Sequence, residues 1–165
     1  MAKYSFPPVV DSATRLLICG SLPGDRSLAA GRYYAHPQNQ FWRLLSPVIG
    51  VDLARLDYDD RLAALLAAHV GLWDSVASAD RPGSGDAAIR DHRPNDLAAL
   101  AESLPELRAV AFNGAAAHRI GARALAGTAL PLIALPSSSP LHTIGIGAKQ
   151  PFWAALAAYL KPAMP

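Results

Sequence analysis

Cysteine and lysine are both scarce in this sequence of 165 residues, and long apolar runs are absent. The single cysteine, Cys19, excludes a disulfide within the chain and an iron–sulfur cluster held by four cysteines. No segment approaches the roughly 20 consecutive apolar residues of a membrane span, and the first residues lack the apolar core of a signal peptide. We therefore expect a cytoplasmic protein with no membrane partner.

Motifs for metals and common cofactors are also missing. The five histidines show no pair at metal-ligand spacing: His36, His69, His92, His118 and His142. The stretch Gly145–Gln150 lacks the Ser or Thr that would complete a phosphate-binding loop, and no Gly-x-Ser-x-Gly elbow of a serine hydrolase occurs. We predict no metal, no metal cluster and no cofactor.

The charge is modestly basic. The formal net charge is +2 with a pI of about 8.9, which suits a nucleic-acid partner but excludes the dense basic field of a non-specific DNA binder. Only three of the 15 cationic side chains are lysines, namely Lys3, Lys149 and Lys161. Chemistry that needs an amine nucleophile therefore has few candidates.

Apolar patterning predicts strands that alternate with helices. Short apolar runs predict four buried strands, at 15–19, 70–73, 109–112 and 130–135. Helical periodicity predicts five helices, at 41–49, 61–69, 97–104, 115–125 and 152–160, the last with Pro151 in its first turn. This order predicts a single α/β domain over residues 1–165, a three-layer α/β/α sandwich around a short, mostly parallel four-stranded sheet.

Polar or turn-rich segments follow each predicted strand. Because ligands of such sheets bind outside the carboxyl ends of the strands, we expect these segments to form one site. The segments are Gly20–Ser27, Asp74–Ser75, Asn113–Gly114 and Pro136–His142.

The segment Tyr33-Tyr34-Ala35-His36-Pro37-Gln38-Asn39-Gln40-Phe41-Trp42 resembles the signature of the mismatch-specific and hypoxanthine-specific branches of the uracil-DNA glycosylase superfamily. Further segments agree in order: Gly20–Gly24, Leu72–Asp74, Arg81–Ser84, Phe112–Gly114 and Leu135–Pro140. The resemblance covers roughly residues 15 to 160 and is closest to the hypoxanthine-DNA glycosylase branch, the sixth family. It implies an enzyme that flips a deaminated base out of DNA and hydrolyses its glycosidic bond, with hypoxanthine favoured over uracil.

The resemblance implies that Asn39 is the catalytic residue. From the sequence alone, without the resemblance, the position of Asn39 favours a helix N-cap over a catalytic residue. In mismatch-specific relatives an asparagine of the first loop positions the attacking water, and Leu22 occupies that slot here. The resemblance to the hypoxanthine branch therefore assigns the water to Asn39, with Asp25 and Asp74 as the alternative carboxylates.

Five residues are predicted to bind the base. The resemblance places Tyr34 where related enzymes stack an aromatic ring on the flipped base, and Asp74 where uracil-specific relatives carry an asparagine. A carboxylate at Asp74 suits a purine N–H, and Asn113 is able either to read the base edge or to form a turn with Gly114. Ser21 and Leu22 of the first loop complete the set.

The last loop resembles the segment with which the superfamily pinches phosphates and fills the gap left by the flipped base. Six residues are predicted to bind DNA: Ser137, Ser138, Ser139, Leu141 and His142 of this loop, and Arg26. Arg81 and Arg90 are further candidates for phosphate contacts. The pair Leu141-His142 departs from the Ala-Asn expected in the hypoxanthine branch, and a leucine is what uracil-specific members carry there.

Three hypotheses follow for the function. The first is a monofunctional glycosylase, because no motif contains a lysine for lyase chemistry, acting as a monomer near the nucleoid. The second is a weak, lesion-binding module, which Leu22 favours. The third is a hydrolase of free nucleosides, against which a wedge-like Leu141 argues.

Overall fold

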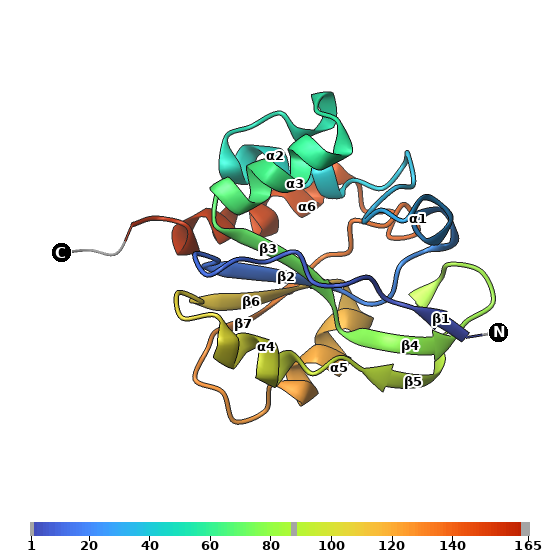
Figure 1. Cartoon of the computed structure of the whole chain (residues 1–165). Helices are drawn as coiled ribbons and strands as arrows, with labels where there is room; N and C mark the ends of the chain where they lie inside the picture. Colours follow the sequence, from blue (N-terminus) through green and yellow to red (C-terminus); the bar gives the residue numbers. More distant parts are fainter. Residues whose placement is uncertain (1, 87–88, 163–165) are drawn as a thin grey trace.

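A four-stranded parallel sheet lies at the centre of the computed structural model, which describes residues 2–86 and 89–162 (Figure 1). In sheet order the strands are β3 (Val70–Asp74), β2 (Leu16–Gly20), β6 (Ala109–Asn113) and β7 (Leu132–Leu135). All pairings among them are parallel. The four strands predicted from apolar runs are confirmed, with shifts of one or two residues at their ends.

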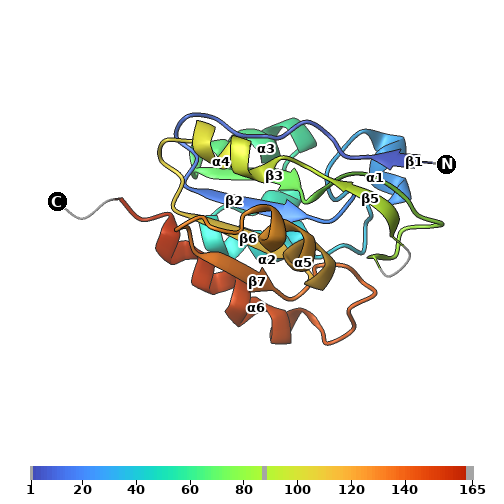
Figure 2. The same ribbon diagram turned by 90° about the horizontal axis from the view of Figure 1, so that it is seen from below.

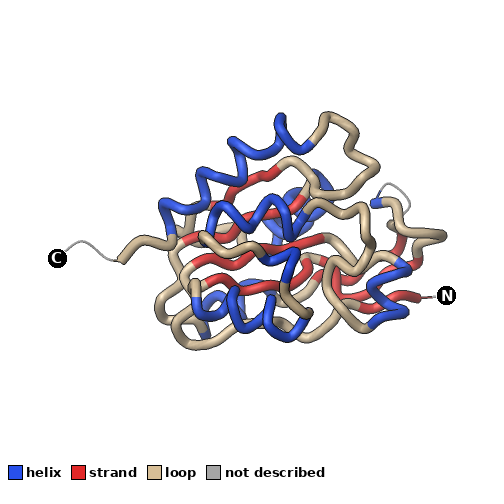
Figure 3. Tube along the Cα trace, turned by 90° about the horizontal axis from the view of Figure 1, so that it is seen from above, coloured by secondary structure: helices blue, strands red, loops and turns tan. Residues whose placement is uncertain are grey.

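Successive residues of β2 face two different apolar cores, as the period of two in a strand requires. Leu16 and Ile18 pack beneath one layer, whereas Leu17 and Cys19 pack beneath the other. The first layer, above the sheet in Figure 1, holds α2 (Phe41–Ile49), α3 (Tyr58–Ala67) and α6 (Ile146–Ala154). The second layer, below the sheet, holds α4 (Leu97–Ser103) and α5 (Ala115–Ala124); Figures 2 and 3 give the views from below and from above. The predicted three-layer sandwich is thus confirmed.

A second, antiparallel sheet was not predicted. It consists of β1 (Ala2–Tyr4), β4 (Val76–Asp80) and β5 (Arg90–Pro94). All five residues of β5 are exposed, and its Arg-Asp-His-Arg-Pro sequence has no apolar alternation to signal a strand. Charged side chains and a terminal proline are typical of an edge strand. Strand β4 of this sheet follows β3 directly after Ser75, and the loop between β4 and β5 begins at the end of β4.

Two helical predictions need correction. The structure adds α1 (Asp25–Ala30), and it starts the last helix at Ile146, so that Pro151 lies inside α6 and not in its first turn. The proline removes the hydrogen bond to the carbonyl of Gly147, a residue that is exposed to water. The chain then continues as the 3-10 helix η3 (Ala155–Tyr159), and another, η1 (Leu53–Arg55), precedes α3. No helix among the described residues is long and apolar enough to cross a membrane.

Candidate functional site

A cavity of about 640 Å³ opens at the carboxyl ends of the parallel strands. Gly20, Asp74 and Asn113 end β2, β3 and β6, and the loop after β7 supplies the remaining wall. All of the predicted site residues line this one cavity: Ser21, Leu22, Arg26, Tyr34, Asn39, Asp74, Asn113, Ser137, Ser138, Ser139, Leu141 and His142. The structure therefore brings together segments that are more than 100 residues apart in the sequence.

A hydrogen-bonded chain joins the two asparagines through Ser138. The Ser138 hydroxyl donates to Asn39 Oδ1 (2.8 Å) and accepts from Asn113 Nδ2 (2.8 Å). Asn39 Oδ1 also accepts the backbone N–H of Phe41 (2.9 Å), and Asn113 Oδ1 accepts the N–H of Ser138 (2.8 Å). Both acceptor positions of Asn39 Oδ1 are thus occupied, which leaves only its Nδ2 group available to a ligand.

Tyr34 lies against Phe41 with the rings parallel. The ring centroids are 3.8 Å apart at an interplanar angle of 10°, so one face of Tyr34 is covered. Its backbone has a left-handed φ of 52°, unusual for an aromatic residue. The hydroxyl is enclosed and has no hydrogen-bond partner among the described residues. Burial raises the pKa of Tyr34 most, and the nearby Asp74 raises it further. The Asn113 amide lowers the pKa by less than this, so the phenol stays neutral.

Asp74 ends β3 with a buried carboxyl. The residue is 4% exposed, and within the described residues its side chain makes no hydrogen bond, with Oδ2 fully enclosed. Burial raises its pKa to about 7; the nearby Asp86 also raises it, and Arg81 lowers it. Gly20 leaves the room for this carboxyl, because a Cβ there would lie 2.8 Å from Asp74 Oδ1 and 2.9 Å from Tyr34 Oη.

Asp86 is a second carboxyl of the cavity, in the loop between β4 and β5. It accepts a hydrogen bond from the Ser21 hydroxyl at 2.5 Å. Burial raises its pKa, while the bond from Ser21 and the charges of Arg81 and Arg119 lower it. From the sequence we assigned Asp86 no role in the site. No local signal marks it, because its place depends on the antiparallel sheet that the sequence did not reveal.

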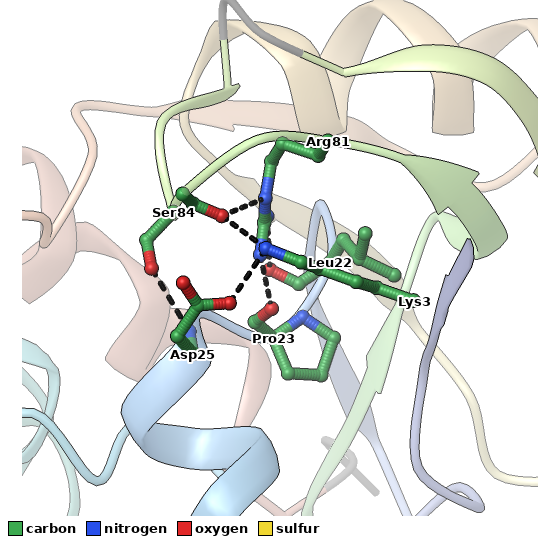
Figure 4. Close-up of polar contacts among 7 residues, drawn as sticks. Lys3, Leu22, Pro23, Asp25, Arg81 and Ser84 are labelled. Atoms are coloured by element: carbon green, nitrogen blue, oxygen red, sulfur yellow. Dashed lines mark hydrogen bonds and ion pairs between the residues drawn. The ribbon is translucent and has the colours of Figure 1, made fainter. Parts of the chain in front are cut away.

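Two cationic side chains, Arg81 and Lys3, bind the first loop at 20–25 (Figure 4). Arg81 is 3% exposed and donates to the carbonyls of Leu22 (3.3 Å) and Pro23 (2.5 Å), so it is not placed to bind phosphate. Lys3 pairs with Asp25 at 2.6 Å, so this carboxylate is already bound by an ammonium group. The side chain of Leu22 packs in a small apolar cluster with Val76, Ala79 and Ile120.

The loop after β7 is shaped by its own serines. Ser137 Oγ accepts the N–H of Ser139, and Ser139 Oγ accepts the N–H of Leu141, both at 3.1 Å. These bonds present Leu141, 72% exposed, at the rim of the cavity beside the exposed His142. Ser138, by contrast, is 1% exposed, and its hydroxyl is already committed to the two asparagines.

Lys149 of α6 supports this loop from beneath, a role that the sequence did not suggest. Its ammonium donates to Gln40 Oε1 (2.9 Å) and to the carbonyl of Ser139 (3.3 Å). It has no carboxylate partner in the described part of the chain, and burial lowers its pKa. Together with the bond from the Gln40 N–H to the Ser138 carbonyl (2.9 Å), it fixes the loop to the start of α2.

Residues 2–86 and 89–162 contain no group of three His, Cys, Asp or Glu side chains that could hold a metal ion. Arg26 of helix α1 and the exposed Leu141 of the loop after β7 both line the cavity. The arrangement thus offers two fixed amides, an aromatic ring and two carboxyls below a polar rim. Such a cavity suits a planar polar ligand that inserts from a larger partner.

Comparison with known proteins identifies relatives over nearly the whole chain. The family model described as the uracil DNA glycosylase superfamily matches residues 7–161. A protein of Methanosarcina barkeri named hypoxanthine DNA glycosylase is 46% identical over 114 residues, which cover 69% of this chain and 72% of the relative. One of the same name from Methanosarcina acetivorans is 41% identical over 139 residues, which cover 84% and 87%.

A solved structure agrees with the sequence relatives. The solution NMR structure of a Methanosarcina acetivorans protein, presented there as a proposed uracil DNA glycosylase, superposes with a TM-score of 0.87 at 38% identity. The match covers 97% of this chain and 99% of that one. The resemblance inferred from the motifs is therefore confirmed, and the chain belongs to the uracil DNA glycosylase superfamily.

Proposed function

We propose that this chain is a monofunctional DNA glycosylase that flips hypoxanthine out of DNA and hydrolyses its N-glycosidic bond, leaving an abasic site for base excision repair. Its superfamily and the two relatives named hypoxanthine DNA glycosylase support a DNA glycosylase that removes deaminated bases. The structural observation that carries the proposal is the cavity at the strand ends, with fixed polar groups inside and an exposed leucine at its rim. Uracil is the second candidate base.

Asn39 is proposed to hold the attacking water. Because its Oδ1 accepts hydrogen bonds from Phe41 and Ser138, Asn39 is not able to take a proton and must act through its Nδ2 group. Donation from Nδ2 to the oxygen of a water would fix that water beside C1′ of the sugar. The negative phosphates of the DNA would stabilise the cationic sugar as the bond to the base breaks.

The base is proposed to lie on Tyr34, whose other face is covered by Phe41. Asp74 and Asn113 form the inner wall beside it, and Ser21 and Leu22 complete the wall on the side of the first loop. Asn113 has one N–H left for a base, because its oxygen and its other N–H bind Ser138.

The rim is proposed to bind the DNA strand. Ser137 and Ser139 would present hydroxyl and backbone N–H groups to phosphates, and Arg26 and His142 would add contacts on the two sides of the cavity. Leu141 would enter the duplex in place of the flipped nucleotide. Ser138 is better placed to orient Asn39 than to bind phosphate, because its hydroxyl is buried.

Hydrolysis without strand cleavage follows from the positions of the lysines. The described residues that line the cavity include no lysine. Lys3 is paired with Asp25, and Lys149 is bound to Gln40 and Ser139 below the loop. An amine nucleophile for lyase chemistry is therefore not at hand. We propose further that residues 1–165 form one domain, which works as a monomer, without a cofactor, on DNA of the nucleoid.

The test is base release from duplexes with a single hypoxanthine or uracil, read by alkaline cleavage of the abasic site. Asn39→Ala should lower the rate by about 100-fold or more, the usual cost of one transition-state hydrogen bond. Gln38→Ala is the matched control, because Gln38 is an exposed neighbour on the same loop. Its rate should stay within about twofold of the wild-type rate.

Other outcomes select the other hypotheses. Tight binding of hypoxanthine duplexes without release would identify a lesion-binding module. Cleavage of free inosine at a comparable rate would instead indicate a nucleoside hydrolase. Release of uracil alone would keep the glycosylase and change its base.

A further inference from the structure

Two buried polar groups at the inner end of the cavity have no hydrogen-bond partner among the described residues. They are the carboxyl of Asp74, through its Oδ2, and the hydroxyl of Tyr34, and no other side-chain nitrogen or oxygen in that part of the chain is buried without a hydrogen bond. Both approach the same point beside Gly20, from which a Cβ would exclude them. Buried polar groups are almost always paired, so this pair indicates where a ligand completes the site.

The protonation state of the Asp74 carboxyl determines which hydrogen-bonding edge of a ligand it can bind. Burial without a hydrogen bond disfavours the anion of a carboxyl more than its neutral acid, so the neutral form of Asp74 persists to a higher pH than in water. A neutral acid has one O–H donor and one carbonyl acceptor side by side. The matching edge carries an acceptor next to a donor, as does the ring lactam, C=O beside N–H, that hypoxanthine and uracil share.

We propose that Asp74 binds the base as a neutral carboxylic acid, which donates its O–H to the lactam oxygen and accepts the adjacent ring N–H. This inference rests on the proposed function and assigns Asp74 a catalytic role within it. A carboxylate at the same place would accept the N–H but repel the lactam oxygen. The neutral acid is thus the form that makes both hydrogen bonds.

The same contact would help the base to leave. When the bond between C1′ and the ring nitrogen breaks, its electron pair stays on the base, and part of that charge reaches the lactam oxygen. The hydrogen bond that the Asp74 O–H donates to this oxygen strengthens as the charge grows, while the proton remains on Asp74. Water adds its oxygen to C1′, and one water proton passes to the ring nitrogen that has left, so the products are a neutral base and an abasic sugar.

Several other groups face Asp74 and bear on the pH dependence. Asp86 disfavours its charged form and Arg81 favours it, while Tyr34 and the buried Cys19 stay neutral because burial, and then Asp74, raises the pKa of each. Because the neutral form is the active one, the rate should fall as the pH rises through about 7. The opposite sign, a rate that rises with pH, would be expected of a carboxylate base.

The substitution Asp74→Asn distinguishes a neutral acid that binds the base from a carboxylate that acts as a general base. An amide offers an N–H donor and a carbonyl acceptor to the same lactam edge at every pH, whereas it is not able to act as a base. Asp74→Asn should therefore lower the rate at pH 6 by about fivefold, reflecting the weaker donor, and abolish the fall at higher pH. Asp74→Leu should lower the rate at pH 6 by about 100-fold and also remove the fall at higher pH.

The experiment measures single-turnover release of hypoxanthine and of uracil from pH 5.5 to 9 by the wild type and these two variants. The wild-type rate should fall about tenfold per pH unit above about 7. Asp86→Asn should keep a falling limb, which assigns the limb to Asp74. Circular dichroism at each pH confirms that every variant is folded.

Each result decides the proposal. It is overturned if Asp74→Asn loses as much rate as Asp74→Leu, if the falling limb persists in Asp74→Asn, or if the wild-type rate does not fall with pH. In those cases base release by the wild type still supports the proposed function. Release of neither base overturns both. A ¹³C titration of the free enzyme adds a readout without substrate, and an Asp74 carboxyl that titrates near pH 4 also overturns the proposal.

Discussion

Asp74→Asn should make the fold more stable above neutral pH and have little effect in acid. The pKa of Asp74 rises from about 3.8 to about 7 on folding, so the folded chain holds the proton more tightly than the unfolded chain does. Below about pH 4 both states are protonated and the carboxyl carries no penalty. Between about pH 4 and 7 stability is lost progressively, and above 7 the loss is complete. At about 1.4 kcal/mol per pH unit, the full penalty is about 4 kcal/mol.

Thermal and urea unfolding of the wild type and Asp74→Asn at pH 4.5, 6 and 8 provide the assay. The difference in unfolding free energy should grow from about 1 kcal/mol at pH 4.5 to about 4 kcal/mol at pH 8, roughly 10 °C in Tm for a chain of this size. Other titrating groups contribute to both proteins and largely cancel. A difference that does not change with pH would refute the neutral, unpaired carboxyl.

Three further predictions concern the loop, the rim and the core. Ser138→Ala should cost about 1–3 kcal/mol in urea unfolding, because two asparagine amides lose their shared partner, and a cost below 0.5 kcal/mol would contradict the network. Leu141→Ala should leave the Tm unchanged but slow base release from paired duplexes more than from single strands; equal slowing would argue against a wedge. Gly121→Ala should destabilise by about 1–3 kcal/mol, since its Cβ would lie 2.2 Å from a ring carbon of Phe112, whereas Gly147→Ala, in open space on α6, should be neutral or stabilising.

The central sheet could be predicted because its signals are local. Each strand is a short apolar run, and α2 was placed to the residue, from Phe41 to the glycine at its end. The antiparallel sheet could not be predicted in this way. Its strand β5 is held by pairing with β4 and carries no apolar side chain of its own.

The residues that line the cavity could be predicted, but the hydrogen bonds among them could not. The motif resemblance selected the loops, and the parallel topology brought their ends together. The orientation of Asn39 depends on Ser138, 99 residues away, and no sequence pattern states which lone pairs are occupied. Asp86 was missed and Arg81 was wrongly expected to bind phosphate for a related reason, since the surroundings of both are set by the fold around the first loop.

The central claim is that this chain excises a deaminated base from DNA by hydrolysis. The most direct measurement incubates the enzyme in excess with a duplex that carries one hypoxanthine, and then analyses both the released base and the DNA by mass spectrometry. We expect free hypoxanthine and an intact strand with an abasic site, and a rate that Asn39→Ala lowers by about 100-fold or more. An unchanged duplex, or a strand already cleaved without alkali, would contradict it.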